Sequence, residues 1–289
     1  MKNYKIVITF FLLWLTIQFD YEAENILAYL SILTLGLLHG ANDIKLLESK
    51  ERSEKVNSYL ILLAYVGFVS VVGLLFYLIP VLALMVFVVL SGFHFGEEHL
   101  HGKYRLQCSL FTYFFTAYGL LILFLIFYFN ATSTSQIIYD ITSYRLGSIF
   151  FLIGVLVSGL GTLLCSILLF KNKRNDVSYL EELVYILVFI IVFKLANLLW
   201  SFAIYFVIWH AIPSLYNQIQ FLYGNTTKTA IIKYFKSSFI YWMFSILGVV
   251  FLYNYLRNDM YLFNAVFFAF LASITFPHVW VINSMKNKQ

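Results

Sequence analysis

The sequence predicts an all-α protein, a polytopic bundle of about ten helices that cross a membrane. Of the 289 residues, 62% are hydrophobic and 11% are charged, whereas soluble domains average about 45–50% apolar and about 25% charged residues. So few charged residues cannot cover a surface that faces water, and lipid must therefore be the main solvent. No polar stretch is long enough for a separate soluble domain, so residues 1–289 are expected to make a single integral membrane domain.

Long apolar segments locate the helices. A spanning helix needs about 20 mostly apolar residues, because the hydrocarbon core is about 30 Å thick and each helical residue rises about 1.5 Å. The first segment follows Lys2 and Lys5 and has no small-residue cleavage site behind it, so we expect a retained helix rather than a signal peptide. The polar stretch 130–135 is expected to be an external turn region. The predicted spans are 5–19, 25–44, 58–78, 81–99, 108–129, 147–170, 179–197, 199–222, 238–256 and 261–283.

The basic residues orient this bundle. An even number of spans puts both termini on one side of the membrane, and 16 of the 19 Lys and Arg residues fall on that side. Because cytoplasmic loops carry an excess of Lys and Arg, both termini are predicted to be cytoplasmic, with the protein in the cell membrane. The net charge of +5 is spread over short loops, which argues against a nucleic-acid partner. The three residues on the opposite side are Arg145, Lys194 and Arg257.

Four of the six histidines lie inside predicted spans and are the candidate metal ligands. His39, His94, His210 and His278 belong to the second, fourth, eighth and tenth spans, which run in one direction across the membrane. At about 1.5 Å per residue, their depths differ by roughly 9 Å, so we expect them in one layer of the cytoplasmic half. Ionisable side chains inside a membrane are costly and usually functional, and bundles build metal sites from side chains that face inward. Imidazole suits iron, copper, zinc and nickel.

Polar residues beside these histidines are expected to orient the imidazole rings. Asp43 follows His39 at i+4, and Glu97 and Glu98 follow His94 at i+3 and i+4, so Asp43 and one of the two glutamates are predicted one turn away on the same helix face. Carboxylates typically accept the second N–H of a metal-bound imidazole. Ser214 lies one turn after the third candidate ligand.

Other polar residues have an ordinary structural explanation. A single membrane histidine can simply bond a neighbouring helix. His99 and His101 lie at the cytoplasmic end of the fourth span and are expected at the interface rather than on a metal. Glu181 and Glu182 open the seventh span, where carboxylates favour a helix start. Asp20, Glu22 and Glu24 are expected to be solvated loop charges.

Four short motifs surround the candidate ligands, in this order over nearly the whole chain: His39-Gly-Ala-Asn-Asp43, Ser91-Gly-Phe-His94-Phe-Gly96, Trp209-His210 and Pro277-His278. Together they resemble the Brp/Blh family of bacterial carotenoid-cleaving membrane enzymes. The resemblance implies an Fe(2+)-dependent dioxygenase that uses O2 to split β-carotene, or a related carotenoid, at its central 15,15′ double bond. The product would be two molecules of all-trans-retinal, which implies a functional link to a retinal-binding rhodopsin.

The resemblance also implies roles for individual residues. His39, His94 and His210 match iron ligands of the family. The family's third motif usually has a second histidine four residues further on, where this chain has Ser214, and a neutral hydroxyl is a poor ligand for ferrous iron. His278 is expected to replace it as the fourth ligand, because it lies in the same layer.

Other functions fit part of the same pattern. Asp43, Glu97 and the histidines could form a proton relay in a proton- or metal-coupled transporter, although we find no internal repeat of the kind common in transporters. Two of the histidines could be axial ligands of a haem. A relative that binds carotenoid or retinal without cleaving it is also open, because of Ser214. Metal analysis of the purified protein separates the dioxygenase from the transporter.

Overall fold

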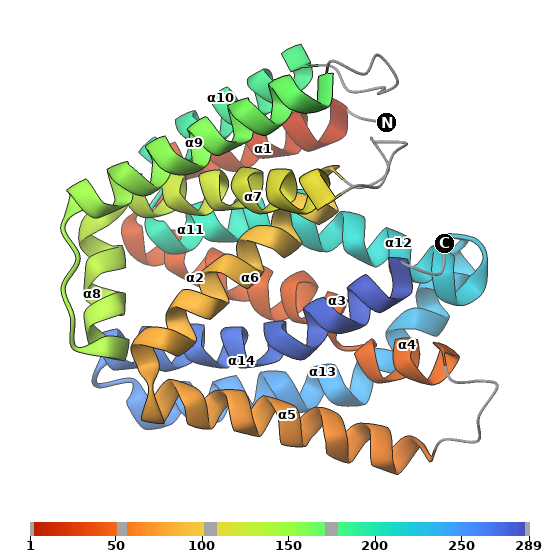
Figure 1. Cartoon of the computed structure of the whole chain (residues 1–289). Coiled ribbons are helices and arrows are strands. Elements are labelled where there is room, and N and C mark those ends of the chain that lie inside the picture. Colours follow the sequence, from red (N-terminus) through yellow and green to blue (C-terminus); the bar gives the residue numbers. More distant parts are fainter. Residues whose placement is uncertain (1–2, 51–56, 101–108, 171–178, 287–289) are drawn as a thin grey trace. The chain divides into compact units, whose positions relative to one another are not determined.

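The computed structural model describes residues 3–50, 57–100, 109–170 and 179–286, and every regular element in these ranges is helical. The all-α prediction is therefore confirmed (Figure 1). The helices form two compact units, each made of three segments of the chain. Unit 1 comprises Met1–Ile32, Val88–Gln136 and Tyr144–His210, and unit 2 comprises Leu33–Phe87, Ile137–Ser143 and Ala211–Gln289. The single-domain assignment stays a prediction.

Unit 1 is built from the N-terminal helices and most of the middle of the chain. Helices α6 (Pro80–Leu100) and α8 (Ala131–Thr142) each contribute residues to both units. The π-helical segments η1 (Ile32–Gly36) and η2 (Tyr205–Ala211) each cross the boundary by one residue. The elements of unit 1 are α1 (Asn3–Gln18), α2 (Tyr21–Ser31), the second half of α6 (Pro80–Leu100), α7 (Ser109–Phe129), the first half of α8 (Ala131–Thr142), α9 (Ser148–Phe170), α10 (Tyr179–Leu195), α11 (Leu198–Ile204) and the π-helical segment η2 (Tyr205–Ala211).

Helices α6 and α7 approach closely because glycines line their contact. A Cβ atom added to Gly96 would collide with the backbone carbonyl of Phe115, and one added to Gly119 would collide with that of Gly92. Small residues permit this kind of backbone contact between membrane helices. The packing fixes the turn of α6 that carries His94.

A buried carboxylate joins α2 to the start of α11. Asp20 caps α2 by accepting a hydrogen bond from the backbone N–H of Ala23 at 2.9 Å. Glu24 is buried and accepts the backbone N–H of Asn197 at 3.1 Å. The expectation that Glu24 is a solvated loop charge is therefore wrong. Its carboxylate accepts a hydrogen bond from an amide at the beginning of the buried helix α11, where N–H groups lack helical acceptors.

Unit 2 contains the remaining elements, and α14 is its central helix because it contacts α3, α4, α5 and α13. Leu46 of α4 packs with Val281, Ile282 and Met285 of α14 in one buried cluster. The elements of unit 2 are η1 (Ile32–Gly36), α3 (Leu37–Gly40), α4 (Asp43–Lys50), α5 (Ser58–Leu78), the first half of α6, the end of α8, α12 (Ile212–Tyr223), α13 (Lys228–Leu256) and α14 (Met260–Lys286).

Two π-helical segments stand next to candidate ligands. In η1, the indole N–H of Trp242 donates to the carbonyl oxygens of Leu33 and Thr34 at 2.9 and 3.2 Å. Such support is needed because the wider turn of a π-helix disturbs the regular backbone bonds. His39 follows η1, and His210 lies within η2. Single π-helical turns occur frequently at functional sites.

Eight of the described helices are long and apolar enough to cross a membrane, which identifies a multi-pass membrane protein. They coincide with the predicted second to sixth and eighth to tenth spans. The predicted first and seventh spans coincide with α1 and α10, which have 16 and 17 residues. Helix α13 begins at Lys228, ten residues before the predicted 238, because its first turns are too polar to be read as part of a membrane span.

The expected turn region at 130–135 is wrong for all but its first residue, because residues 131–135 begin helix α8. A run of Ser and Thr suggests a loop, yet the same side chains favour helix starts by capping exposed N–H groups. The cytoplasmic location of the termini stays a prediction. His101 and nine of the basic residues used for it lie outside the described residues: Lys2, Arg52, Lys55, Lys103, Arg105, Lys171, Lys173, Arg174 and Lys288.

Candidate metal centre

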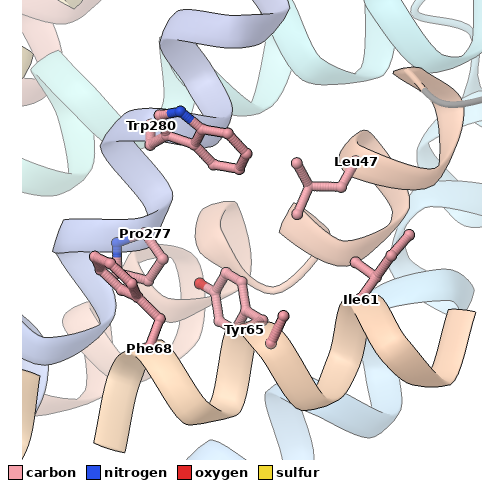
Figure 2. A pocket seen from close by; sticks show the side chains of 7 residues that line it. Leu47, Ile61, Tyr65, Phe68, Pro277 and Trp280 are labelled. Carbon is pink, nitrogen blue, oxygen red and sulfur yellow. The ribbon is translucent and has the colours of Figure 1, made fainter. Parts of the chain in front are cut away.

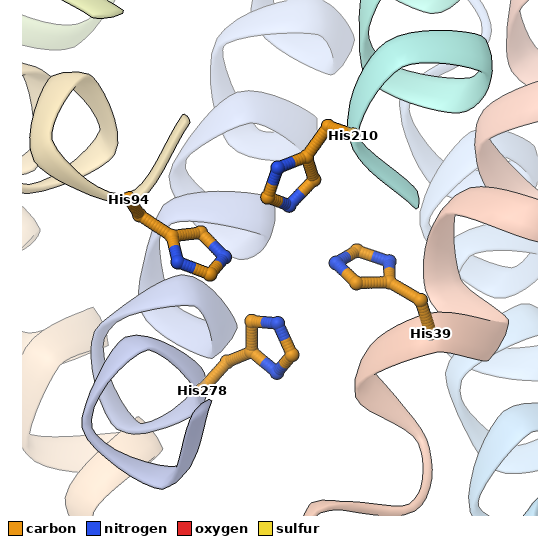
Figure 3. Close-up of side chains that lie close together, drawn as sticks. All are labelled: His39, His94, His210 and His278. Carbon is orange, nitrogen blue, oxygen red and sulfur yellow. The ribbon is translucent and has the colours of Figure 1, made fainter. Parts of the chain in front are cut away.

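In unit 2, the rings of His39 and His278 lie edge to face, close enough for both to bind one metal ion. Their centroids are 4.7 Å apart and their planes are nearly perpendicular, at 87° (Figure 3). Both side chains are buried. His39 donates its Nδ1–H to the carbonyl oxygen of Gly36. A carbonyl can only accept, so the proton lies on Nδ1 and the lone pair that can bind a metal lies on Nε2.

Asp43 orients the imidazole of His278. Its Oδ1 accepts the Nδ1–H of His278 at 2.8 Å, and its Oδ2 accepts the hydroxyl proton of Tyr65 at 2.7 Å. The sequence predicts Asp43 as a partner of the neighbouring His39, through i+4 helix geometry. That geometry does not hold, because the helix is interrupted after Gly40 and α4 restarts at Asp43. A carboxylate that accepts from Nδ1 leaves Nε2 to bind a metal, as is usual for metal-bound histidine.

A polar network holds the backbone of His39. The amide N–H groups of Gln218 donate to the carbonyl of His39 at 2.8 Å and to the hydroxyl of Ser214 at 3.1 Å. Tyr234 donates its hydroxyl proton to Oε1 of Gln218 at 2.7 Å. All these residues are buried. Ser214 therefore acts through Gln218 on the main chain of a candidate ligand.

In unit 1, His94 of α6 and His210 of η2 form a second pair. Their ring centroids lie 4.6 Å apart, at an interplanar angle of 74° (Figure 3), and each side chain is 1% exposed. Aromatic rings pack around this pair. Phe206 stacks on His210 with a centroid distance of 5.6 Å, and Phe95 lies 4.7 Å from the same ring. Such packing restricts the rotation of an imidazole ring.

All four candidate histidines, two in each unit, are buried. Each offers one ring nitrogen. The donor set fits a first-row transition metal, since neutral imidazole suits iron, copper, zinc and nickel. The hydrogen bonds at two of the Nδ1 atoms fit the same use. Glu97 is buried on α6, and its predicted role beside His94 stays a prediction.

His99 is buried inside the protein, and its expected position at the membrane interface stays a prediction. Its Nε2 lies 2.9 Å from Oε2 of Glu182 and 3.1 Å from the hydroxyl of Tyr118, and its ring stacks on Trp209 at 5.8 Å. Glu182 is thus more than a helix-start carboxylate. The pairing satisfies a carboxylate and an imidazole that would both be costly if buried alone. Among the described residues, His99 is not part of the metal-type group.

Unit 2 also contains two cavities, of about 620 and about 270 Å³. The larger lies among α3, α4, α5, α13 and α14, and Gly40 and Asp43 are in its wall. The smaller is lined by Leu47, Ile61, Ala64, Tyr65, Phe68, Pro277 and Trp280 (Figure 2). Both volumes are near the range of small-molecule sites, about 300–1,000 Å³. These cavities border the segments that carry His39 and His278.

Three residues at the site escape sequence analysis. Gln218 gives a weak signal, as an uncharged polar residue one turn after Ser214 in an apolar helix. Tyr65 and Tyr234 give none, because they are two of 22 tyrosines in the chain. Their roles depend on partners that are distant in sequence.

The fold and the histidines define a class: a multi-pass, all-α membrane protein with a pair of buried imidazoles in each of its two units. Within that class, the chain belongs to the β-carotene 15,15′-dioxygenase family, whose model matches residues 30–286. The match confirms the resemblance found in the sequence motifs, and it supports a function of the β-carotene dioxygenase type. No curated protein and no solved structure matches the chain significantly.

Proposed function

We propose that this protein is an iron-dependent dioxygenase that cleaves β-carotene at the central 15,15′ double bond into two molecules of all-trans-retinal. The observation that carries the proposal is the set of four buried histidines inside the region matched by the family. In this proposal, His39, His94, His210 and His278 bind one ferrous ion. Asp43 stands behind His278, Glu97 beside His94, and Ser214 supports the backbone of His39 through Gln218.

Iron, when bound, would supply the activation of O2, which none of these side chains can perform. The overall reaction breaks both bonds of one carbon–carbon double bond. Each of the two carbons gains one oxygen atom of the same O2 molecule and becomes an aldehyde. Atoms and electrons balance without any reductant or added proton, so the site needs no further cofactor.

The side chains of this chain bind and orient. The hydrogen bonds from Nδ1 of His39 and His278 keep both rings in the tautomer that presents Nε2. The aromatic rings of Phe95 and Phe206 restrict His210 and keep water away. Fixed ligands and a dry, apolar surrounding favour productive positioning of a nonpolar substrate.

The membrane supplies the substrate in this proposal. β-Carotene dissolves in the lipid bilayer, and the larger cavity of unit 2 is lined mostly by apolar side chains of α5, α13 and α14. Apolar side chains on the outer faces of α5 and α13 are exposed. We propose that the protein lies in the cell membrane, takes carotenoid from it and releases retinal to a retinal-binding rhodopsin.

The test is expression of the chain in cells that make β-carotene, with iron supplied and retinal measured by chromatography. We expect retinal to accumulate while β-carotene falls, and no retinal in cells with the His39→Ala variant. Unchanged β-carotene, with the protein present in the membrane, would contradict the proposal. Carotenoid that purifies with the uncleaving protein would identify a binding relative, and a protein that holds no metal would favour a transporter.

A further inference from the structure

Tyr65 in unit 2 contacts the carboxylate of Asp43 and lines both cavities. It lies on α5, half-buried, and its hydroxyl donates to Oδ2 of Asp43 at 2.7 Å. The other oxygen of the same carboxylate accepts Nδ1–H of His278 at 2.8 Å. A chain of two hydrogen bonds therefore runs from Tyr65 to a candidate ligand. Hydrogen-bonded carboxylates hold metal-bound imidazoles in place, and their own partners fix them in turn.

Tyr65 also borders both cavities of unit 2. Of the residues that the structure describes, Tyr65 alone lines both the larger and the smaller cavity. Figure 2 shows its ring in the wall of the smaller cavity, with the hydroxyl oxygen turned toward Pro277. Asp43 is in the wall of the larger cavity, and Pro277, next to His278, is in the wall of the smaller one. Tyr65 therefore borders both cavities beside Asp43, the residue that holds His278.

We propose that Tyr65 is a positioning residue with two tasks. Its hydroxyl holds Asp43 in place, and Asp43 in turn holds His278 on the metal. Its ring limits how far a polyene rod can enter, and this limit selects the double bond that is cut. This inference rests on the proposed function. The double bonds of the polyene are conjugated and similar in reactivity, so the depth to which the rod enters strongly influences which of them meets the metal. A displacement of about 1 Å can cost about 100-fold in rate, so a fixed wall matters.

The two tasks can be separated with two substitutions. Tyr65→Phe keeps the ring and removes the hydroxyl, and Tyr65→Ala removes both, which should open the wall that borders the two cavities. Tyr77→Phe and Tyr77→Ala are matched controls, because Tyr77 lies on the same helix and is 83% exposed. Thermal melting in detergent checks that each variant is folded and compares its stability with that of the wild type.

The first readout is the release of iron to a chelator from purified protein, which requires no catalysis. We expect Tyr65→Phe to release iron about 10-fold faster than the wild type, at the lower end of effects seen for groups behind metal ligands. Tyr77→Phe should match the wild type. Release from Tyr65→Phe at the wild-type rate, while Asp43→Asn releases iron faster, would overturn the role of the hydroxyl.

The second readout is the length of the aldehydes formed from β-carotene, measured by mass spectrometry. We expect Tyr65→Phe to make retinal alone, and Tyr65→Ala to make additional pairs of aldehydes of unequal length. Retinal as the sole product of Tyr65→Ala would overturn the role of the ring. If the wild type holds iron but makes no aldehyde, the proposed function fails, while the release experiment still decides whether the hydroxyl acts on the metal.

Discussion

The two histidine pairs are held in different ways. In unit 2, the Nδ1 atoms of His39 and His278 donate to oxygen acceptors, the carbonyl of Gly36 and the carboxylate of Asp43. In unit 1, aromatic rings pack around His210. A hydrogen bond to an acceptor selects the tautomer as well as the ring orientation, whereas ring packing restricts orientation alone. The iron affinity that depends on His39 and His278 should therefore respond to changes of charge nearby. The iron affinity that depends on His94 and His210 should respond to the loss of neighbouring aromatic rings.

The largest effect is expected from removal of a ligand in either pair. His278→Ala should lower iron affinity by more than about 100-fold, which exceeds the effect typical of groups behind a metal ligand, and abolish retinal formation. His94→Ala should do the same, because the proposal gives both pairs one ion. Iron content after dialysis and retinal yield are the measurements.

His99→Ala is the control for those variants. His99 is buried and paired with Glu182, so its loss should lower the melting temperature but leave iron bound. If His94→Ala keeps full iron affinity while His278→Ala loses it, the pairs do not share an ion and the comparison breaks.

Asp43→Asn should give the next largest effect. The substitution keeps the shape of the side chain but removes the negative charge that favours the Nδ1–H tautomer of His278. Loss of a carboxylate behind a metal-bound histidine typically costs about 10–100-fold in metal affinity. Titration of the metal-free protein with ferrous iron measures the change. Glu48→Gln, also on α4, is the matched control and should bind iron as the wild type does.

Much of the fold was predictable because it depends on local composition. Apolar segments of sufficient length marked the helices, and α5 coincides with its predicted span of 58–78. Polar helix starts were not predictable in this way, as α8 and the first turns of α13 demonstrate. The reason is physical, since apolar length reports the part of a helix that lipid surrounds and not its polar ends.

The candidate ligands were predictable for a different reason. A histidine inside an apolar span is conspicuous because its burial is costly. Their partners were less visible, because they depend on packing between distant segments. Asp43 was expected to serve His39 and serves His278, which is 235 residues away. The sequence likewise gives no sign that His99 pairs with Glu182, 83 residues away.

A smaller effect on iron affinity is expected when an aromatic ring beside His210 is removed. Phe206→Leu keeps apolar bulk and removes the ring that stacks on His210. Aromatic pairs contribute about 1 kcal/mol beyond burial, so iron affinity should fall by about 5-fold. Phe251→Leu, on an exposed face of α13, should have no effect. A loss as large as that of Asp43→Asn would show that packing orients imidazole as firmly as a charged acceptor does.

The smallest effect is expected from Ser214→Ala, and it decides what a hydroxyl does where the family usually has a histidine. If Ser214 supports His39 through Gln218, the substitution removes one neutral hydrogen bond, which contributes about 1 kcal/mol to stability. The melting temperature should fall slightly while iron affinity stays within about twofold, because Gln218 still holds the carbonyl of His39 and receives the hydroxyl proton of Tyr234. If Ser214 binds the metal instead, iron affinity should fall as far as in His278→Ala. Titration of both variants with ferrous iron distinguishes the two roles, since a network through the backbone acts on stability whereas a ligand acts on the metal.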